Sequence, residues 1–409
     1  MTITIRKLTI TVISILTTAL FVLFVLFDMY SWGKYVFLGL SASIFLLGCY
    51  LNNGKIVFKL NTYVALNFLF IGYVLLSSFW AMRQSDTVTM ARTLLRIFVC
   101  AYAVYIAYVN APELDIALLM KTLMWAGYFV AVYTLIFYGL DRMVEASGDA
   151  RLRVDNEFAN VNAIGMACVL SCLIQINLKV LDRKVRFFPS VLFMIPSIIV
   201  FAATQSRKAF VFLVIGIIGY VVIKALESDK RATTKFIQIL FSIILCSAAI
   251  YLILHFGIFA GVRERMQSYI NSLLGMGKVD HATILRNTLR ALGKESFLKH
   301  PIGGVGIANP HIIVWERLNY DAYMHDNFIE LLCGGGIVGF CLYYVMYAYL
   351  FKQLWRYRDV DKSRVAFFSI WLGLMLIMNY GMVTYYSKLQ NFYLMIHFLN
   401  VHELKRKAI

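Results

Sequence analysis

Four short stretches of this 409-residue chain carry side chains suited to phosphate binding and proton transfer. In the first, Arg286, Arg290 and Lys294 recur every four positions, which would place them on one face of a helix. A guanidinium group can grip a diphosphate through two parallel hydrogen bonds, which an ammonium group cannot. A stripe of this kind also suits solvent or lipid headgroups, so the spacing leaves both interpretations open.

A histidine is the centre of the second stretch, where His325, Asp326, Asn327 and Glu330 precede or begin an apolar run. Imidazole is the side chain best matched to proton transfer near neutral pH, and the start of a helix favours negative charge. This pattern predicts a reacting centre. The alternative is that Asp326 or Asn327 only caps the helix and that His325 is a surface residue.

Charged and polar side chains also stand where two other apolar runs meet loops. Arg207 and Lys208 fall in a tight bend between apolar runs, where a charge at the edge of the hydrocarbon is costly and often functional, although both could simply reach the headgroups. Arg96 lies one turn after Arg92 and could line the same cavity, although we expect no direct role for it. A further loop adds four candidates, of which the first asparagine could be a helix cap: Arg151, Arg153, Asn160 and Asn162.

The elements that would position these residues follow from composition. Apolar residues make up 61% of the chain and charged residues only 15%, with a mean hydropathy of +0.73, which excludes a soluble globular domain. The net charge of +17 lies between the apolar runs, so it does not indicate a nucleic-acid partner.

The apolar runs predict an all-α, polytopic membrane protein, because only helices pair every backbone group within one segment of this length. We predict about twelve spans, with ten to thirteen possible: Leu8–Phe27, Tyr35–Leu51, Asn61–Trp80, Thr93–Val109, Ala117–Leu140, Asn160–Leu178, Phe187–Gln205, Ala209–Ile223, Phe236–Phe256, Phe328–Phe351, Val365–Val383 and Leu389–Val401.

The distribution of Lys and Arg among the short loops predicts that both termini are cytoplasmic. The first apolar run has no cleavage pattern and is expected to remain as an anchor. The polar segment from about Gly257 to Asn327 is then a large extracytoplasmic loop, helical in part, of a single membrane domain covering residues 1–409. All seven cysteines fall in predicted spans without metal-ligand spacing, so we expect no disulfide, no metal and no cofactor.

Three motifs, in this order, resemble the signature of the O-antigen ligase and O-antigen polymerase superfamily. They are Thr204-Gln-Ser-Arg-Lys-Ala-Phe, Arg286 upstream of His300-Pro-Ile-Gly-Gly-Val-Gly, and His325-Asp-Asn-Phe-Ile-Glu-Leu-Leu followed by Gly336-Ile-Val-Gly. The segment Asn160-Val-Asn is similar to an Asn-x-Asn segment common in that superfamily. The glycine-rich run lets backbone amides approach an anion, but it lacks the context of a Walker or Rossmann fingerprint.

The resemblance implies a metal-independent, inverting glycosyltransferase with a GT-C-like fold in the bacterial cytoplasmic (inner) membrane. Its donor would be a glycan on undecaprenyl diphosphate, used at the periplasmic or outer face among the membrane lipids. The resemblance implies that Arg207 and Arg286 grip the diphosphate and that His325 sits at the reacting centre, as a general base or as an orienting group. Further substrate-binding residues would be Arg290, Arg151, Arg153, Asn327, Lys208, Asn160 and Asn162.

Two acceptors fit this donor, and the sequence favours the first. A polymerase passes the glycan to another lipid-linked repeat unit, of O-antigen or capsule, whereas an O-antigen ligase passes it to the lipid A core of lipopolysaccharide. Arg290 lies near the spacing from Gly306 that is described for polymerases, while the loop with Arg151 departs from it. A polysaccharide transporter or flippase is less favoured, because no internal repeat is visible and the predicted midplanes carry almost no charge. The sugars, the linkage and the oligomeric state are not specified by the sequence.

Overall fold

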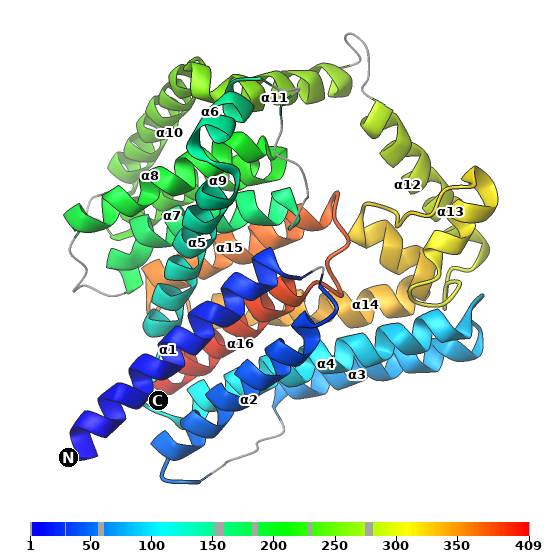
Figure 1. Ribbon diagram of the computed structural model, residues 1–409, viewed down its shortest axis with the longest axis horizontal. Coiled ribbons are helices and arrows are strands. Elements are labelled where there is room, and N and C mark those ends of the chain that lie inside the picture. Colours follow the sequence, from blue (N-terminus) through cyan, green and yellow to red (C-terminus); the bar gives the residue numbers. More distant parts are fainter. Residues whose placement is uncertain are drawn as a thin grey trace.

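Helices are the only regular secondary structure in the described part of the computed structural model, which comprises residues 2–28, 30–55, 61–149, 152, 159–181, 187–227, 231–274 and 281–408 (Figure 1). The all-α prediction is therefore confirmed. The α-helices are α1 Thr2–Leu26, α2 Gly33–Leu51, α3 Thr62–Leu76, α4 Gln84–Asn110, α5 Ile116–Tyr138, α6 Leu140–Gly148, α7 Val161–Leu181, α8 Phe187–Thr204, α9 Arg207–Glu227, α10 Ala232–Leu254, α11 Ala260–Leu273, α12 His281–Lys299, α13 Pro310–Leu318, α14 Asn327–Arg356, α15 Lys362–Asn379 and α16 Lys388–Lys407. Two short 3-10 helices cover Ser77–Phe79 and Gly257–Phe259.

Six helical segments in the described residues are long and apolar enough to cross a membrane, which makes the protein a multi-pass membrane protein. They are Thr4–Leu26, Gly33–Leu51, Thr62–Phe79, Gln84–Asn110, Ile116–Tyr138 and Asn327–Arg356, and shorter apolar helical stretches cover Val161–Asn177, Met194–Thr204 and Thr233–Ala248. Each of the twelve predicted spans overlaps a helix. The count of twelve, and the GT-C-like fold, stay predictions.

Helix α16 illustrates why a helix can fall short of the hydropathy of a span. It packs against α1, α4, α5, α14 and α15, so protein surrounds much of its surface. Polar side chains are tolerated there because they find protein partners. Asn400, for example, accepts a 2.6 Å hydrogen bond from Arg364 Nε, and the same guanidinium pairs with Glu403 at 2.9 Å.

Several predicted boundaries differ from the helices, and three of them are instructive. Helix α4 begins at Gln84, nine residues before the predicted Thr93, because its polar first turns are still helical. Helix α5 ends at Tyr138, and Leu140 already belongs to α6. The predicted span Val365–Val383 ends too late: α15 stops at Asn379, and residues 380–387 form a loop that becomes important below.

Both termini lie at one end of the helix bundle (Figure 1). At that end, the Arg6 guanidinium donates to the carbonyl of Leu51 and pairs with Glu113 between α4 and α5. The opposite end, where α1 stops and α16 starts, is marked by an ion pair between Asp28 and Lys388. We call it the distal end.

The described residues between α10 and α14 form helices α11, α12 and α13. Helices α12 and α13 pack on the start of α14 through a small apolar cluster of their own, made of Leu289, Val305, Val314, Met324 and Cys333. We call α12, α13 and the start of α14 the lobe. It lies at the distal end and carries the first two predicted polar stretches, Arg286–Lys294 and His325–Glu330.

Candidate functional site

Helix α12 presents its basic residues on one side because its other side is anchored. Leu289 is fully buried in the cluster of the lobe, whereas Arg286 and Arg290 are only partly buried and Lys294 is exposed. No hydrogen bond or ion pair is formed by the Arg286 guanidinium within the described part of the chain. Its charge is therefore available to a ligand.

Arg290 has a different environment from Arg286. Its Nε donates a 3.1 Å hydrogen bond to Asp326 Oδ2, in an ion pair whose side chains are 17% and 3% exposed. Its Nη1 donates to the hydroxyl of Tyr380 at 3.0 Å, and the guanidinium carbon lies 4.0 Å from the centre of the Tyr380 ring. The other oxygen of Asp326 caps α14 by accepting from the backbone N–H groups of Phe328 and Ile329. Arg290 thus braces the start of α14.

Asn327 is fully buried, and its amide group is used within the protein. The side-chain oxygen accepts from the backbone N–H groups of Thr384 and Tyr385 at 2.7 and 3.0 Å, and the side-chain nitrogen donates to the Tyr344 hydroxyl at 2.9 Å. These bonds attach the 380–387 loop to α14.

His325 lies in the chain between Met324 and the anchored residues Asp326 and Asn327. Its backbone has the left-handed conformation, with φ of 53°. Met324 is fixed by its own backbone N–H, which donates to Glu330 at 2.9 Å. A non-glycine residue keeps such a φ where its neighbours hold the backbone in place. The imidazole ring lies 4.1 Å from the Tyr323 ring, centre to centre, and is partly exposed.

The electrostatic surroundings of His325 keep it neutral. Burial lowers the pKa of His325 to about 4, and the positive charges of Arg286, Lys208 and Arg290 act in the same direction. A neutral imidazole at neutral pH can accept a proton, and the three nearby cations suit an anionic ligand beside it.

Lys208 reaches this region from the first turn of α9. Its Nζ donates a 2.6 Å hydrogen bond to the carbonyl of Gly381. Gly381 has φ of 108°, and a Cβ built on it would lie 3.6 Å from Lys208 Cε and 3.9 Å from the carbonyl oxygen of His325. The 380–387 loop therefore lies between α9 and the histidine, which sequence analysis did not predict.

The bend before α9 is held by polar bonds to two other segments. Gln205 Nε2 donates to the carbonyls of Ala146 and Asp149, both at 2.7 Å, and Ser206 donates to Asn162 Oδ1 at 3.1 Å. Asn162 in turn donates its backbone N–H to Asn160 Oδ1, which fits the predicted capping of α7. Arg207 opens α9 beside this bend. The other two candidates, Arg151 and Arg153, lie outside the described residues.

The glycine-rich run 300–306 packs against α14. The Val305 N–H donates to Cys333 at 3.0 Å, and the Ile337 N–H donates to the carbonyl of Pro301 at 2.9 Å. Gly336 has φ of 60° and interrupts α14 there, and a Cβ on it would lie 2.2 Å from the carbonyl oxygen of Ile302. Glycine is required for this close approach.

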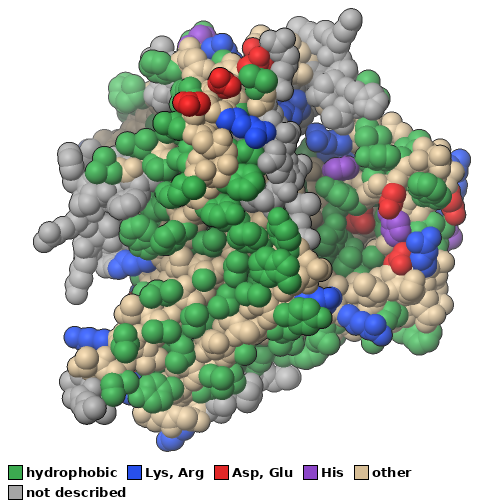
Figure 2. All heavy atoms as spheres, in the orientation of Figure 1, with side chains coloured by type: hydrophobic (Ala, Val, Ile, Leu, Met, Phe, Trp, Pro, Cys, Tyr) green, Lys and Arg blue, Asp and Glu red, His purple; other side chains and the backbone are tan. Residues whose placement is uncertain are grey.

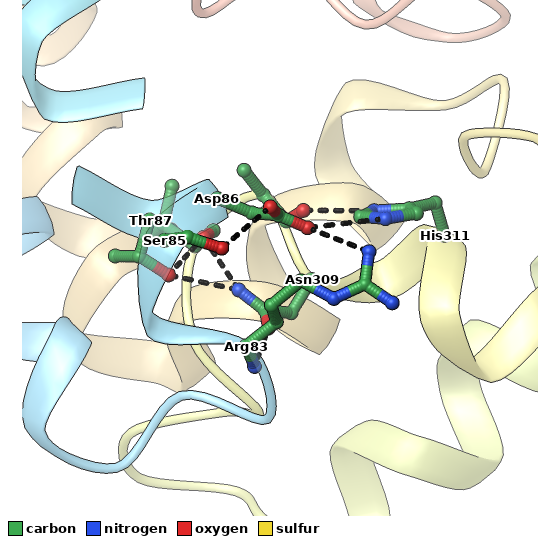
Figure 3. A network of polar contacts seen from close by, with 8 residues as sticks. Arg83, Ser85, Asp86, Thr87, Asn309 and His311 are labelled. Atoms are coloured by element: carbon green, nitrogen blue, oxygen red, sulfur yellow. Dashed lines mark hydrogen bonds and ion pairs between the residues drawn. The ribbon is translucent and has the colours of Figure 1, made fainter. Parts of the chain in front are cut away.

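The segment that follows this run, residues 307–311, is tied to Arg83 and to the first turn of α4 (Figure 3). Asn309 donates to Thr87 Oγ1 at 2.8 Å, and Thr87 donates to the carbonyl of Ile307 at 2.8 Å. Asp86 Oδ2 lies 3.4 Å from Arg83 Nη1 and 3.4 Å from His311 Nε2. This network fixes the lobe to α4.

Taken together, the structure brings Arg286, Arg290, Lys208 and His325 to one region at the distal end. Figure 2 shows a hollow between the lobe and the rest of the bundle, with Lys, Arg and His side chains at its wall. Within the described ranges, no group of three or more His, Cys, Asp or Glu side chains could hold a metal ion. The site is thus a group of three cations around one neutral imidazole.

A comparison with known protein families finds a match in the part of the chain that contains this site. The sequence model of the O-antigen ligase family matches residues 192–344, which run from α8 into α14 and include Arg207, Arg286 and His325. No curated protein matches the chain. Over residues 192–344 this multi-pass helical chain is thus similar to the O-antigen ligase family, which agrees with the resemblance of its sequence motifs to the O-antigen ligase and O-antigen polymerase superfamily.

Proposed function

We propose that this protein is a membrane glycosyltransferase that takes a glycan from undecaprenyl diphosphate and polymerises repeat units of O-antigen or capsule. The observation that carries the proposal is the neutral His325 among Arg286, Lys208 and Arg290, inside the segment that matches the O-antigen ligase family. A group of cations suits a diphosphate, and a neutral imidazole suits an acceptor hydroxyl.

The cations would act on the leaving group. Breaking the bond between the sugar and the diphosphate leaves the electron pair on a diphosphate oxygen, so negative charge grows there. Arg286, which has no other partner in the described chain, and Arg207 at the start of α9 would hold this group, assisted by Lys208. Positive groups fixed in advance stabilise such a transition state without a metal ion.

His325 would act on the acceptor. The acceptor hydroxyl attacks the anomeric carbon from the side opposite the diphosphate, which inverts the configuration, and its proton passes to the imidazole. A pKa of about 4 makes the free imidazole a weak base. A bound diphosphate would bring negative charge beside it, offset the three cations and raise that pKa, so the base becomes stronger when the donor is present.

Arg290 would position the start of α14 beside His325 rather than bind the substrate. It holds Asp326, and Asp326 caps the helix that follows His325. Asn327 would keep the 380–387 loop beside the same histidine. Both residues were predicted to contact substrate, and we now propose that they set the geometry of those that do.

The distal end would face the periplasm or cell exterior. Support comes from the positive-inside bias of the loops, which places the two termini in the cytoplasm, and from the structure, in which the termini and the candidate site lie at opposite ends. Undecaprenyl-linked glycan would then reach the site from the outer leaflet of the cytoplasmic membrane.

A second candidate is an O-antigen ligase, which transfers the glycan to lipid A core. The description of the matching family favours it. The two candidates are separated by giving the purified protein a lipid-linked repeat unit, with or without lipid A core, and resolving the products by size. A ladder without lipid A core supports the polymerase, a product made only with lipid A core supports the ligase, and no transfer in either assay contradicts both.

A further inference from the structure

A second cavity lies at the distal end, away from α12 and His325, between α1, α2, α4 and α16. Its volume is about 240 Å³. Four charged side chains line it: Asp28, Lys34, Arg96 and Lys388. We call it the α1–α16 cavity. None of the residues placed in the candidate site belongs to its lining.

The cavity carries an excess of positive charge. Three cations and one carboxylate give a net charge of +2 if all four groups are ionised. Lys388 uses the carboxylate, because it forms an ion pair with Asp28, and its Nζ also lies 4.6 Å from the centre of the Phe37 ring. Within the described residues, neither Lys34 nor Arg96 pairs with a carboxylate. These two charges are therefore available to an anion.

Below the charges the wall is apolar. Phe24 lies 4.7 Å from Phe37 and 4.6 Å from Phe392, centre to centre, and Leu38 and Ile97 complete the wall. An inorganic anion would gain nothing from such a surface, whereas a molecule with a charged head and an apolar chain would bury both parts.

Three of the four charged side chains stand at helix ends, and the ends of membrane-spanning helices are where lipid headgroups are met. Lys34 is the second residue of α2, Lys388 is the first residue of α16, and Asp28 follows the end of α1. Arg96 lines the same cavity from within α4, where a charge among apolar residues is costly unless it has a functional partner.

We propose that the α1–α16 cavity binds the phosphate-bearing headgroup of a lipid, with Lys34 and Arg96 holding the phosphate and the lipid chain lying over Phe24 and Phe37. The cavity is connected to the candidate site through the 380–387 loop and α16. Lys388, which lines the cavity, directly follows that loop, and Asn327, two residues after His325, accepts hydrogen bonds from Thr384 and Tyr385 within it.

If the proposed function holds, this position suits a second lipid-linked substrate, whose phosphate would bind here while its glycan reaches His325. The lipid phosphate could also belong to a bulk anionic phospholipid. The chemistry of recognition is the same, and the experiment separates the two sources.

The test measures lipid binding and not transfer, so that it does not depend on the proposed reaction. The purified protein in detergent is titrated with phosphatidylglycerol, undecaprenyl diphosphate or inorganic pyrophosphate, and the bound fraction is read by native mass spectrometry. The double variant Lys34→Gln/Arg96→Gln removes the two available charges. Arg92→Gln is the matched control, because Arg92 is exposed on the same helix one turn away and does not line the cavity.

We expect the double variant to bind the lipid roughly 30-fold more weakly, given about 1 kcal/mol for each basic residue near a lipid phosphate. Arg92→Gln should bind as the wild type does, and Lys34→Arg/Arg96→Lys, which keeps both charges, should retain most of the affinity and show that the cavity still folds. Undecaprenyl diphosphate that displaces phosphatidylglycerol would identify a substrate site, and the reverse preference would identify a phospholipid site.

Two results would overturn the inference. One is equal lipid binding by the wild type and the double variant. The other is pyrophosphate binding as tight as lipid binding, which would leave the apolar wall without a role. Failure of the proposed function would look different, because the wild type would then transfer no glycan even though the charge-dependent lipid binding persists.

Discussion

Arg290 and Asp326 form an ion pair of 3.1 Å, with the carboxylate buried and the guanidinium partly buried, that links α12 to the first turn of α14, one residue from His325. The pair is 36 residues apart in the chain, and the carboxylate also caps the helix. A basic residue that looked like a phosphate ligand in the sequence thus has an internal partner, while Arg286, one turn earlier on α12, has none in the described chain. The two arginines should respond differently to mutation.

Arg290→Ala should destabilise the lobe by about 3–5 kcal/mol, because it leaves Asp326 buried without its charge partner. Arg286→Ala is the control, since Arg286 forms no hydrogen bond or ion pair within the described chain and its loss should change stability little. Thermal unfolding of the two purified variants in the same detergent checks this. Equal melting temperatures for both would mean that the ion pair contributes nothing to the lobe.

Arg286→Ala should abolish glycan transfer while protein level and thermal stability stay unchanged. Arg286→Lys should restore little, because one ammonium cannot reproduce the planar two-donor fork. Arg207→Ala should behave like Arg286→Ala. Transfer is measured with purified protein and lipid-linked repeat unit. Near wild-type rates for both alanine variants would place the diphosphate elsewhere, with Arg151 and Arg153 as the next residues to test.

The helical framework and the basic face of α12 were predictable, because both depend on local periodicity. Apolar runs specify helices, and Arg286 and Arg290 at a spacing of four share a face wherever a helix forms. The glycine-rich run was also visible, but its packing on Gly336 was not, since the pattern shows that backbone can approach without showing what approaches it.

The 380–387 loop was missed for a physical reason. Tyr380, Gly381 and Val383 continue an apolar stretch, so hydropathy extended the span through them. What ends α15 and places the loop is tertiary: Asn327, 57 residues earlier, accepts from Thr384, and Arg290, 90 residues earlier, donates to Tyr380. Contacts at such separations leave no local signal in a single sequence.

The orientation of the chain predicts which ends an impermeant reagent can reach. In a background free of native cysteines, Lys294→Cys should react with an impermeant maleimide in intact cells, because Lys294 is exposed on α12 at the distal end. Lys362→Cys, at the start of α15, is the matched control at the end that carries the termini and should react only after permeabilisation. The opposite pattern would place the candidate site in the cytoplasm and contradict the proposed donor.

His325→Ala should lower the transfer rate by roughly 10²- to 10⁴-fold, the usual value of general-base assistance, while leaving donor binding intact. Asn327→Ala should instead lower stability, because it unties the 380–387 loop from α14. Transfer should persist in the presence of EDTA, as expected of metal-independent chemistry. A chelator-sensitive reaction, or a fully active His325→Ala protein, would contradict the proposed mechanism.

The last prediction concerns pH. Burial first, and then Arg286, Lys208 and Arg290, lower the pKa of His325 from 6.5 to about 4 in the folded protein, so the unfolded chain binds the proton more readily between these values. The folded state is therefore stabilised by this group above pH 6.5, and that contribution is lost as the pH falls toward 4. As the pH falls through this window, the melting temperature of the wild type should drop more than that of His325→Gln, because glutamine binds no proton there.

The pH dependence of the transfer rate should report the protonation of the same histidine. Transfer should fall on acidification as the imidazole becomes protonated, with an apparent pKa above 4 because the bound diphosphate offsets the cations. Arg286→Gln removes one of those cations and should move the midpoint of any residual activity to higher pH, whereas Lys294→Gln, exposed on the same helix, should leave it in place. If the midpoint pH changes neither with donor concentration nor in Arg286→Gln, a group other than His325 titrates in the reaction.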